Sequence, residues 1–475
     1  MGLQLALLIC TVGVAGLFFL DRDKSVRTSF ALWLPVIWLW LAGSRSVSTW
    51  LGVAGSSGNV LASTLDGSPL DAVIYQVLIV VGVVVLLQRW KKTKALLKAS
   101  SPILIYFLYC LMSTMWSPFH GPSFKRWIKA VGDLVMVLII VTDVHPMTAL
   151  RRLYSRVGFI LLPLSVVLIR YSDLGRGYDP QGNPMNTGVT TNKNTLGLIL
   201  FVVSLGAFWN VRALFRDKKA PSRTRRLVAQ VTLLVFGIAL LQMAHSATSV
   251  FCFVLGAGLM LASGLRSIRR RPGRVHALCL GILIVGALTV TFGGGTAVTS
   301  TMGRSSDFSG RSEIWKAAIA AADSPWLGTG FESFWNANAQ KVAHILRDYW
   351  NISNLNSAHN GYLQIYLDLG WVGVCLLSTI IISGYLSAVK AFQRNRDLGC
   401  LMLAYIVTCA FYSITEAGFR ILTPSWIFLL LAVVGANGIT IGLLRPKQTK
   451  IPALRASIDS EPEVIGEPTP MEQFS

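Results

Sequence analysis

Thirteen long apolar segments recur along the chain, and they restrict its fold more than any other feature. A helix needs about 20 apolar residues to cross about 30 Å of hydrocarbon, and several of these segments are shorter. Only 14% of the residues are charged, which is about half of what a water-facing surface requires. We therefore expect an all-α polytopic membrane protein with about 12–13 transmembrane helices. The segments lie approximately at 3–20, 28–43, 72–88, 101–115, 128–142, 157–170, 195–211, 227–243, 249–265, 275–292, 364–388, 398–413 and 425–443.

The basic residues separate the two sides of the predicted membrane. If successive loops alternate in side, 30 of the 43 Lys and Arg residues fall on one side. The positive-inside rule assigns that side to the cytoplasm, which predicts an outer N-terminus and a cytoplasmic C-terminus. The net charge of +21 is then a topology signal, and no nucleic acid is expected as a partner. The long loops near 44–71, 171–194 and 293–363 face outward.

A single membrane domain is expected to occupy residues 1–443. The tail over 444–475 is rich in proline and carboxylates, which predicts a disordered cytoplasmic segment. Within the membrane domain, the outer loop 293–363 holds apolar residues at helical spacing, over about 314–322 and 331–349. These patterns predict two amphipathic helices that either cover a site along the membrane face or merely pack on the bundle.

Motifs of several enzyme classes are missing from the sequence. It contains no Gly-rich phosphate loop ending in Lys-Ser/Thr, no His-Glu-x-x-His and no Gly-x-Ser-x-Gly. Nucleotide hydrolysis, zinc proteolysis and serine hydrolase chemistry therefore lack support. The seven cysteines all fall inside apolar segments, and we interpret them as small core residues. We expect neither a metal site nor a cofactor.

One histidine stands out on the predicted outer surface. His359 directly precedes the eleventh apolar segment, which predicts its ring in the first turn of a helix. A helix N-terminus disfavours imidazolium, so we expect a neutral ring that can accept a proton. The alternative is a capping or interfacial histidine. Glu416, in the short outer loop before the last segment, is a second candidate, for orienting His359 or a sugar.

Several cations lie on the outer side, against the positive-inside gradient. Arg311 is expected at a helix start, and Arg170, Arg176 and Lys193 lie in or beside the second long loop. Each cation alone fits an interfacial anchor. Together they are better explained by an anionic ligand such as a phosphate or diphosphate.

The fifth apolar segment carries charges at its start. Arg126 is an interfacial anchor that is also a candidate contact for lipid phosphate. Lys129 and Asp133 are four residues apart, which predicts a structural pair along one helix face.

Four short motifs occur in an order and spacing that carry a resemblance. The motifs are Lys193-Asn194-Thr195-Leu196-Gly197, Gly310-Arg311 with Ile314-Trp315, Pro325-Trp326-Leu327-Gly328-Thr329-Gly330-Phe331, and His359-Asn360-Gly361-Tyr362-Leu363 with Gly370. At these motifs the chain resembles the O-antigen ligase and Wzy polymerase superfamily, particularly exopolysaccharide polymerases of the ExoQ type. The resemblance spans the chain from about Gly43 to Glu416.

The resemblance implies a multi-pass GT-C-type glycosyltransferase in the bacterial inner membrane, which takes glycan from undecaprenyl diphosphate on the periplasmic face. It implies that His359 is the base and that Arg311 is one diphosphate-binding arginine. Arg176 is the implied second arginine, with Arg170 as the nearby alternative. Two guanidiniums on the diphosphate remove the need for a metal, and direct displacement with inversion is expected. The remaining candidates for substrate binding are Arg170, Lys193, Arg126 and Glu416.

The odd number of segments departs from this family, whose members usually keep both termini in the cytoplasm. Either one segment is miscounted or the first is an addition.

The predicted activity is polymerisation of undecaprenyl-diphosphate-linked oligosaccharide repeats into a surface polysaccharide or exopolysaccharide. The expected partners are that lipid-linked oligosaccharide, a glycan acceptor and the lipid bilayer, and a chain-length regulator is a further candidate. An O-antigen ligase that transfers glycan to the lipid A core shares the same chemistry and stays open. A lipid-linked sugar transporter is the rival class, but it requires charged or broken helices near the bilayer midplane and two related halves. Neither feature is visible in the sequence.

Overall fold

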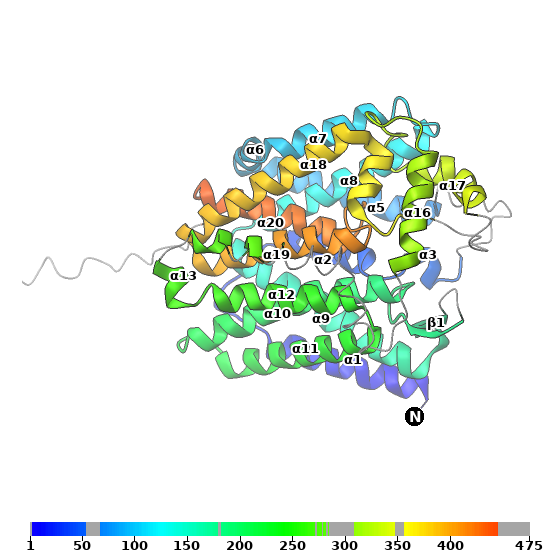
Figure 1. The fold of residues 1–475 in the computed structure, drawn as a ribbon. Helices are drawn as coiled ribbons and strands as arrows, with labels where there is room; N and C mark the ends of the chain where they lie inside the picture. Colours follow the sequence, from blue (N-terminus) through cyan, green and yellow to red (C-terminus); the bar gives the residue numbers. More distant parts are fainter. Residues whose placement is uncertain are drawn as a thin grey trace, which may run out of the picture. The chain divides into compact units, whose positions relative to one another are not determined.

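The computed structural model describes residues 2–53, 67–178, 182–270, 273–277, 279–281, 284, 308–346 and 356–444, and Met1–Leu444 form one compact unit (Figure 1). The predicted tail lies outside the described residues, as do most of the predicted segment 275–292 and part of the loop 293–363. The helices are α1 (Leu3–Leu20), α2 (Trp33–Ala42), α3 (Val47–Trp50), α5 (Pro69–Gln88), α6 (Trp90–Ala99), α7 (Ser101–Ser113), α8 (His120–Val141), α9 (Pro146–Tyr171), α10 (Lys193–Arg216), α11 (Arg223–Ala244), α12 (Ala247–Ala262), α13 (Arg266–Arg270), α16 (Phe308–Ala321), α17 (Phe334–Ile345), α18 (Gly361–Arg394), α19 (Arg396–Thr415) and α20 (Pro424–Thr440).

The apolar helices confirm a polytopic membrane protein. Seven described helices are long and apolar enough to cross a membrane, or eight if α6 and α7, bent by 85°, count as one broken span. The expected number of 12–13 is higher because α2, α12 and α20 have only 10, 16 and 17 residues and because α8 begins with several charged residues. Most of the predicted segment 275–292 lies outside the described residues. The basic stretch 89–98, expected to be a loop, forms most of α6.

Close helix packing builds the core around α10, which contacts α9, α11, α12, α19 and α20. A Cβ on Gly206 would lie 2.3 Å from the ring of Tyr154, so α9 and α10 approach closely through a small residue, as helices in membranes commonly do. The Tyr154 ring also stacks on Phe428 of α20 at 5.7 Å between centroids. Tyr405 of α19 completes this aromatic cluster.

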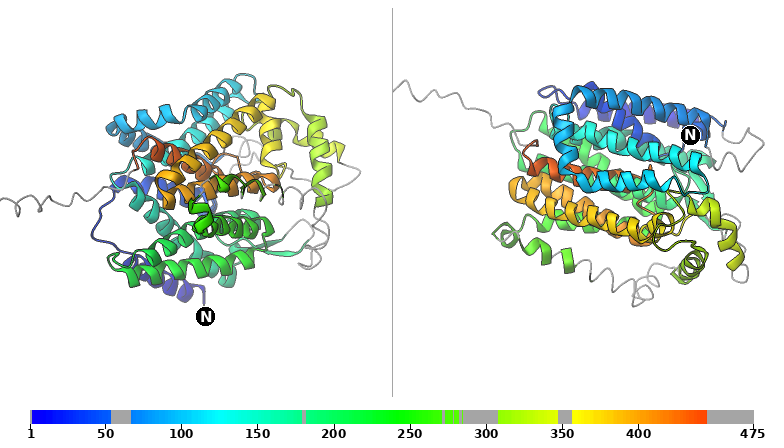
Figure 2. Two further views of the ribbon diagram at one scale, coloured as in Figure 1. Left: turned by 60° about the vertical axis from the view of Figure 1, so that its left-hand side comes forward. Right: turned by 90° about the horizontal axis from the view of Figure 1, so that it is seen from above.

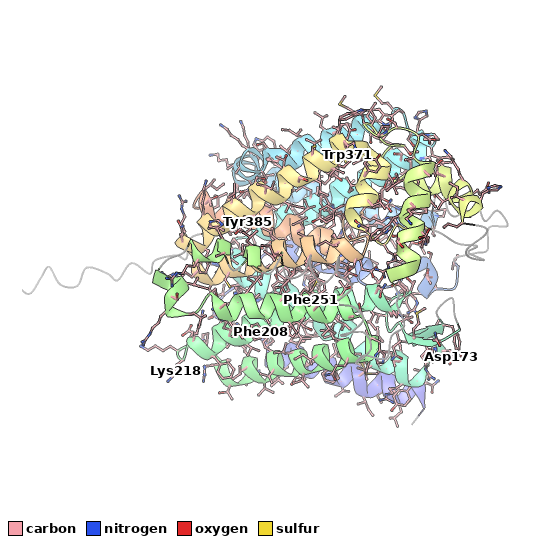
Figure 3. All side chains as sticks on the ribbon, viewed as in Figure 1. Asp173, Phe208, Lys218, Phe251, Trp371 and Tyr385 are labelled. Atoms are coloured by element: carbon pink, nitrogen blue, oxygen red, sulfur yellow. The ribbon has the colours of Figure 1, made fainter. Side chains whose placement is uncertain are left out.

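The two ends of the helix bundle carry different elements. One end, the α16 end, holds α3, α16, α17 and a hairpin of β1 (Arg176–Tyr178) and β2 (Pro184–Asn186), whereas α13 lies at the opposite, α13 end (Figure 1). In Figure 3, Asp173 and Lys218 lie at these opposite ends. The antiparallel hairpin pairs Arg176 with Asn186 and is a small addition to the expected all-α fold. All three predicted outer loops therefore contribute to the α16 end.

A break in α18 fixes the loop that precedes α17. Gly370 has a left-handed φ of 65°, which glycine tolerates because it has no Cβ. The backbone bonds missing at the break are replaced by the segment 325–330. Its amides at Thr329 and Gly330 donate to the carbonyls of residues 367 and 368, and its carbonyls at residues 325 and 326 accept from the amides of residues 371 and 372. The motif that begins at Pro325 thus has a clear structural role. The sequence analysis did not predict the break in α18.

Candidate functional site

Glu416 lies at the centre of a polar cluster at the α16 end. It follows α19 directly, and its side chain is only 10% exposed. Its Oε2 lies 3.3 Å from His359 Nδ1, and its Oε1 lies 3.3 Å from Arg311 Nη2 and accepts a 2.9 Å hydrogen bond from Asn194 Nδ2. The carboxylate therefore joins three of the four motifs, which come from α10, α16 and the segment before α18. We call His359, Arg311, Asn194 and Glu416 the Glu416 cluster.

The sequence analysis expected His359 in the first turn of a helix. In the structure His359 lies just before α18 begins. Asn360 takes the N-cap position, because its side chain accepts hydrogen bonds from the amides of Tyr362 and Leu363. His359 itself has a left-handed φ of 48°, a conformation that is uncommon outside glycine and is found more often where function constrains the backbone. Its side chain is 43% exposed, so the ring is held by Glu416 on one side and remains open to solvent.

The contact with Glu416 assigns the two ring nitrogens of His359 different roles. A carboxylate accepts hydrogen bonds, so Nδ1 carries the proton that points to Glu416. Nε2 is then left with its lone pair when the ring is neutral. This arrangement, in which a carboxylate fixes the tautomer of a histidine, is the one that general bases commonly use.

Arg311 reaches the cluster from α16. Its Nη1 donates to the carbonyl oxygen of Thr415 at 2.5 Å, in addition to the contact of Nη2 with Glu416. The helix itself is held by Trp315, whose Nε1 donates to the carbonyl oxygen of Ala358 at 2.7 Å. The apolar faces of α16 and α17 pack together and against the first part of α18. Both helices thus form as expected, and they position Arg311 and the backbone next to His359.

A second ion pair lies beside the cluster and was not recognised in the sequence. Arg420 Nη2 lies 3.0 Å from the buried Glu332 Oε2, and this carboxylate raises the pKa of Arg420 above its ordinary value. Arg126 Nη1, from α8, donates to the backbone carbonyl of Glu332 at 2.6 Å. Glu332 is a carboxylate among aromatic residues in the loop predicted to face outward, and this isolated charge was the available signal.

The loop between α19 and α20 is also tied to the interior of the bundle. The amide of Leu422 donates to Asp133 Oδ2 at 3.1 Å, and Trp38 Nε1 donates to Asp133 Oδ1 at 2.8 Å. The prediction that Lys129 pairs with Asp133 is wrong, because the Lys129 ammonium lies over the ring of Tyr75 instead. Asp133 therefore fixes the loop that carries Glu416.

The other predicted cations lie at the α16 end but outside the cluster. Arg170 in the last turn of α9 and Arg176 on β1 are both exposed. Lys193 is the first residue of α10, next to Asn194 of the cluster. Within the described part of the chain, none of the three forms a hydrogen bond or ion pair with Glu416. Their roles stay predictions.

A buried arginine missed in the sequence analysis holds the hairpin region. Arg45 donates to the carbonyl of Gly188 at 2.7 Å and to that of Leu174, on either side of the hairpin. It also contacts Thr187 Oγ1 at 3.2 Å. Burial lowers the pKa of Arg45, but its role here is structural, because the carbonyls that it contacts belong to the loop that carries Arg176.

The described residues contain no group of three His, Cys, Asp or Glu side chains that converge as metal ligands. The chemistry of the Glu416 cluster is that of one imidazole, one guanidinium and the carboxylate between them. Such a set can accept a proton and contact an anion within a few ångströms.

Two comparisons with known proteins bear on this site. Residues 231–378 match the family model of the O-antigen ligase, a range that contains Arg311, Glu332 and His359 but ends before Glu416. The chain is also 25% identical over 357 residues to the exopolysaccharide production protein ExoQ of Rhizobium meliloti (strain 1021). This alignment covers 71% of the chain and 77% of ExoQ.

Proposed function

We propose, from the O-antigen ligase family domain that this chain carries and from its distant homology to ExoQ, that it is a membrane glycosyltransferase. The proposed reaction joins oligosaccharide repeat units, carried on undecaprenyl diphosphate, into an exopolysaccharide. One observation supports the site in particular: a single carboxylate, that of Glu416, contacts both His359 and Arg311 at 3.3 Å. A base and a cation are thus held next to one another, as transfer from a diphosphate donor requires.

In the proposed reaction, an acceptor hydroxyl attacks the anomeric carbon of the donor sugar. His359 Nε2 takes the hydroxyl proton, while Glu416 accepts the Nδ1–H and stabilises the imidazolium that forms. The bond between the anomeric carbon and the diphosphate oxygen breaks, and the electron pair leaves with the lipid diphosphate. Arg311 stabilises the charge that grows on this leaving group. A single displacement of this kind inverts the anomeric configuration.

Arg176 is the proposed second arginine for the diphosphate, with Arg170 as the nearby alternative. Both lie at the end of the bundle that carries the Glu416 cluster, and both side chains are exposed. Lys193 and Arg126 are proposed to contact the rest of the lipid-linked substrate, one from the start of α10 and the other from the start of α8.

We propose that the α16 end faces the periplasm and the α13 end the cytoplasm of the inner membrane. The concentration of Lys and Arg in the loops of the α13 end supports this orientation under the positive-inside rule. The donor's diphosphate then meets the site at the outer membrane interface, with its polyprenyl chain in the bilayer.

A ligase is the second candidate, because the matching family model is described as an O-antigen ligase. Deleting the gene and sizing the cell-surface glycan tests both candidates. Loss of long chains with single repeats remaining indicates a polymerase. Intact polymer that stays on its lipid carrier indicates a ligase, and an unchanged glycan contradicts both proposals.

A further inference from the structure

A large cavity lies at the α13 end, far from the Glu416 cluster. It has a volume of about 650 Å³ and lies between the end of α1, the segment 21–30 and the first half of α9. The segment 21–30, drawn in dark blue, and α16 lie at opposite ends of the bundle in the left view of Figure 2. The cavity therefore takes no part in the proposed transfer reaction.

The two carboxylates in the cavity wall already have partners. Asp23 Oδ2 lies 3.0 Å from Arg226 Nη1, and Asp21 Oδ1 accepts a hydrogen bond from Gln230 Nε2 at 2.8 Å. Arg152 supports the same wall, since it donates to the carbonyls of Asp23 and Val26. The segment after α1 is thus fixed in place, and of its two carboxylates Asp23 is already paired with a cation, Arg226.

Four more basic side chains line the cavity. Arg22, Lys24 and Arg27 are exposed, and Arg156 lies with its guanidinium 4.3 Å from the ring centroid of Trp33. Within the described residues, none of the four forms an ion pair with a carboxylate. The lining therefore carries a clear excess of positive charge, on side chains from two separate elements.

Apolar groups lie in and next to the charged lining of the cavity. Phe18 and Phe30 lie in its lining, and the Phe30 side chain is 85% exposed. The helix α1 that leads to the cavity is apolar except for Gln4 and Thr11 and buries only Ala6, so most of its surface faces lipid in a membrane. A ligand that fits both features has an anionic head and a long apolar part.

We propose that this cavity binds the phosphate headgroup of an anionic phospholipid from the leaflet that the α13 end meets. Arg22, Lys24, Arg27 and Arg156 contact the phosphate, and the acyl chains lie along the exposed face of α1. A free anion would gain nothing from the apolar surface, whereas a lipid uses both the charged lining and α1.

Native mass spectrometry of the purified full-length chain tests the proposal. The delipidated protein is titrated with dioleoyl phosphatidylglycerol, which is anionic, and with dioleoyl phosphatidylcholine, which is zwitterionic. The test variant carries Lys24→Gln and Arg27→Gln. The matched control carries Lys218→Gln and Lys219→Gln, which remove two exposed charges from the same end of the bundle.

The wild type and the control are expected to bind phosphatidylglycerol more tightly than phosphatidylcholine. The test variant is expected to lose more than about tenfold in affinity for phosphatidylglycerol alone, since each basic residue near an anionic headgroup contributes severalfold. Equal binding by all three proteins would overturn the proposal, as would equal losses in the test and control variants. Displacement of the lipid by excess inorganic phosphate would also overturn it, because the ligand would then be a free anion.

Discussion

Replacing Glu416 with Gln should slow glycosyl transfer while leaving the protein folded. The substitution keeps the size of the side chain but removes its charge and one of its two acceptor oxygens. Three donors now share the carboxylate: His359 Nδ1, Arg311 Nη2 and Asn194 Nδ2. A glutamine offers them a single carbonyl oxygen, and its own NH₂ group must face at least one of the three.

The size of the effect follows from these contacts. A hydrogen bond that involves a charged group contributes about 1.5–3 kcal/mol, and each 1.4 kcal/mol of transition-state stabilisation changes a rate about tenfold. If the lost contact is the one to His359, the imidazolium that forms in the transition state loses its carboxylate. We therefore expect kcat to fall about 10- to 100-fold, with a smaller change in KM.

The assay uses purified protein and a lipid-linked repeat unit, with product length and initial rate measured across a range of pH. Glu313→Gln is the matched control, since Glu313 lies on α16 next to Arg311 but pairs with the exposed Lys316. Glu416→Asp, which keeps the charge, should recover part of the rate. A purely structural role would lower thermal stability and leave the pH profile of the remaining activity unchanged. A Glu416→Gln variant with wild-type kcat and pH profile would refute Glu416 as the positioning residue.

Three further outcomes are expected. His359→Ala should abolish polymer formation at an unchanged protein level, and a variant that still assembles polymer would remove the base assignment. Arg176→Gln should raise KM for the lipid-linked donor about tenfold or more, in line with one lost charge-assisted contact, whereas Arg170→Gln should not; the reverse result would exchange their roles. Gly370→Ala should destabilise the protein by about 3 kcal/mol or more, because left-handed strain adds to lost backbone hydrogen bonds. Thermal unfolding in detergent, with Gly258→Ala in an open position of α12 as the control, measures that loss.

The sequence predicted the helical membrane fold because hydrocarbon imposes a simple rule on length and apolarity. It could not predict which segments bend. The break at Gly370 depends on hydrogen bonds to the segment 325–330. The 85° angle between α6 and α7 occurs at Ser100, whose hydroxyl accepts a hydrogen bond from the distant Asn437. The predicted number of spans was too high for a related reason, since apolar length alone does not show where a helix ends.

The candidate site was predictable only where charge stood out against its surroundings. His359, Arg311 and Glu416 were chosen from separate loops, and the structure brings their side chains into contact. Glu332 also carried such a charge, but its partner Arg420 is 88 residues away along the chain, so the ion pair could not be recognised before the structure placed the two side chains in contact. The expected pair of Lys129 and Asp133 failed for a related reason: helical spacing permits a contact, but Trp38 and the backbone of Leu422 donate to Asp133, and the Lys129 ammonium lies over the ring of Tyr75.

The hydrogen bonds between the segment 325–330 and the broken helix α18 make part of the loop 293–363 inseparable from the membrane core. A chimera that exchanges this loop between the chain and a relative must therefore carry the first half of α18 with it. Grafting the loop alone would leave amides and carbonyls of the recipient helix without partners, and the hybrid would lose stability at the break in this helix.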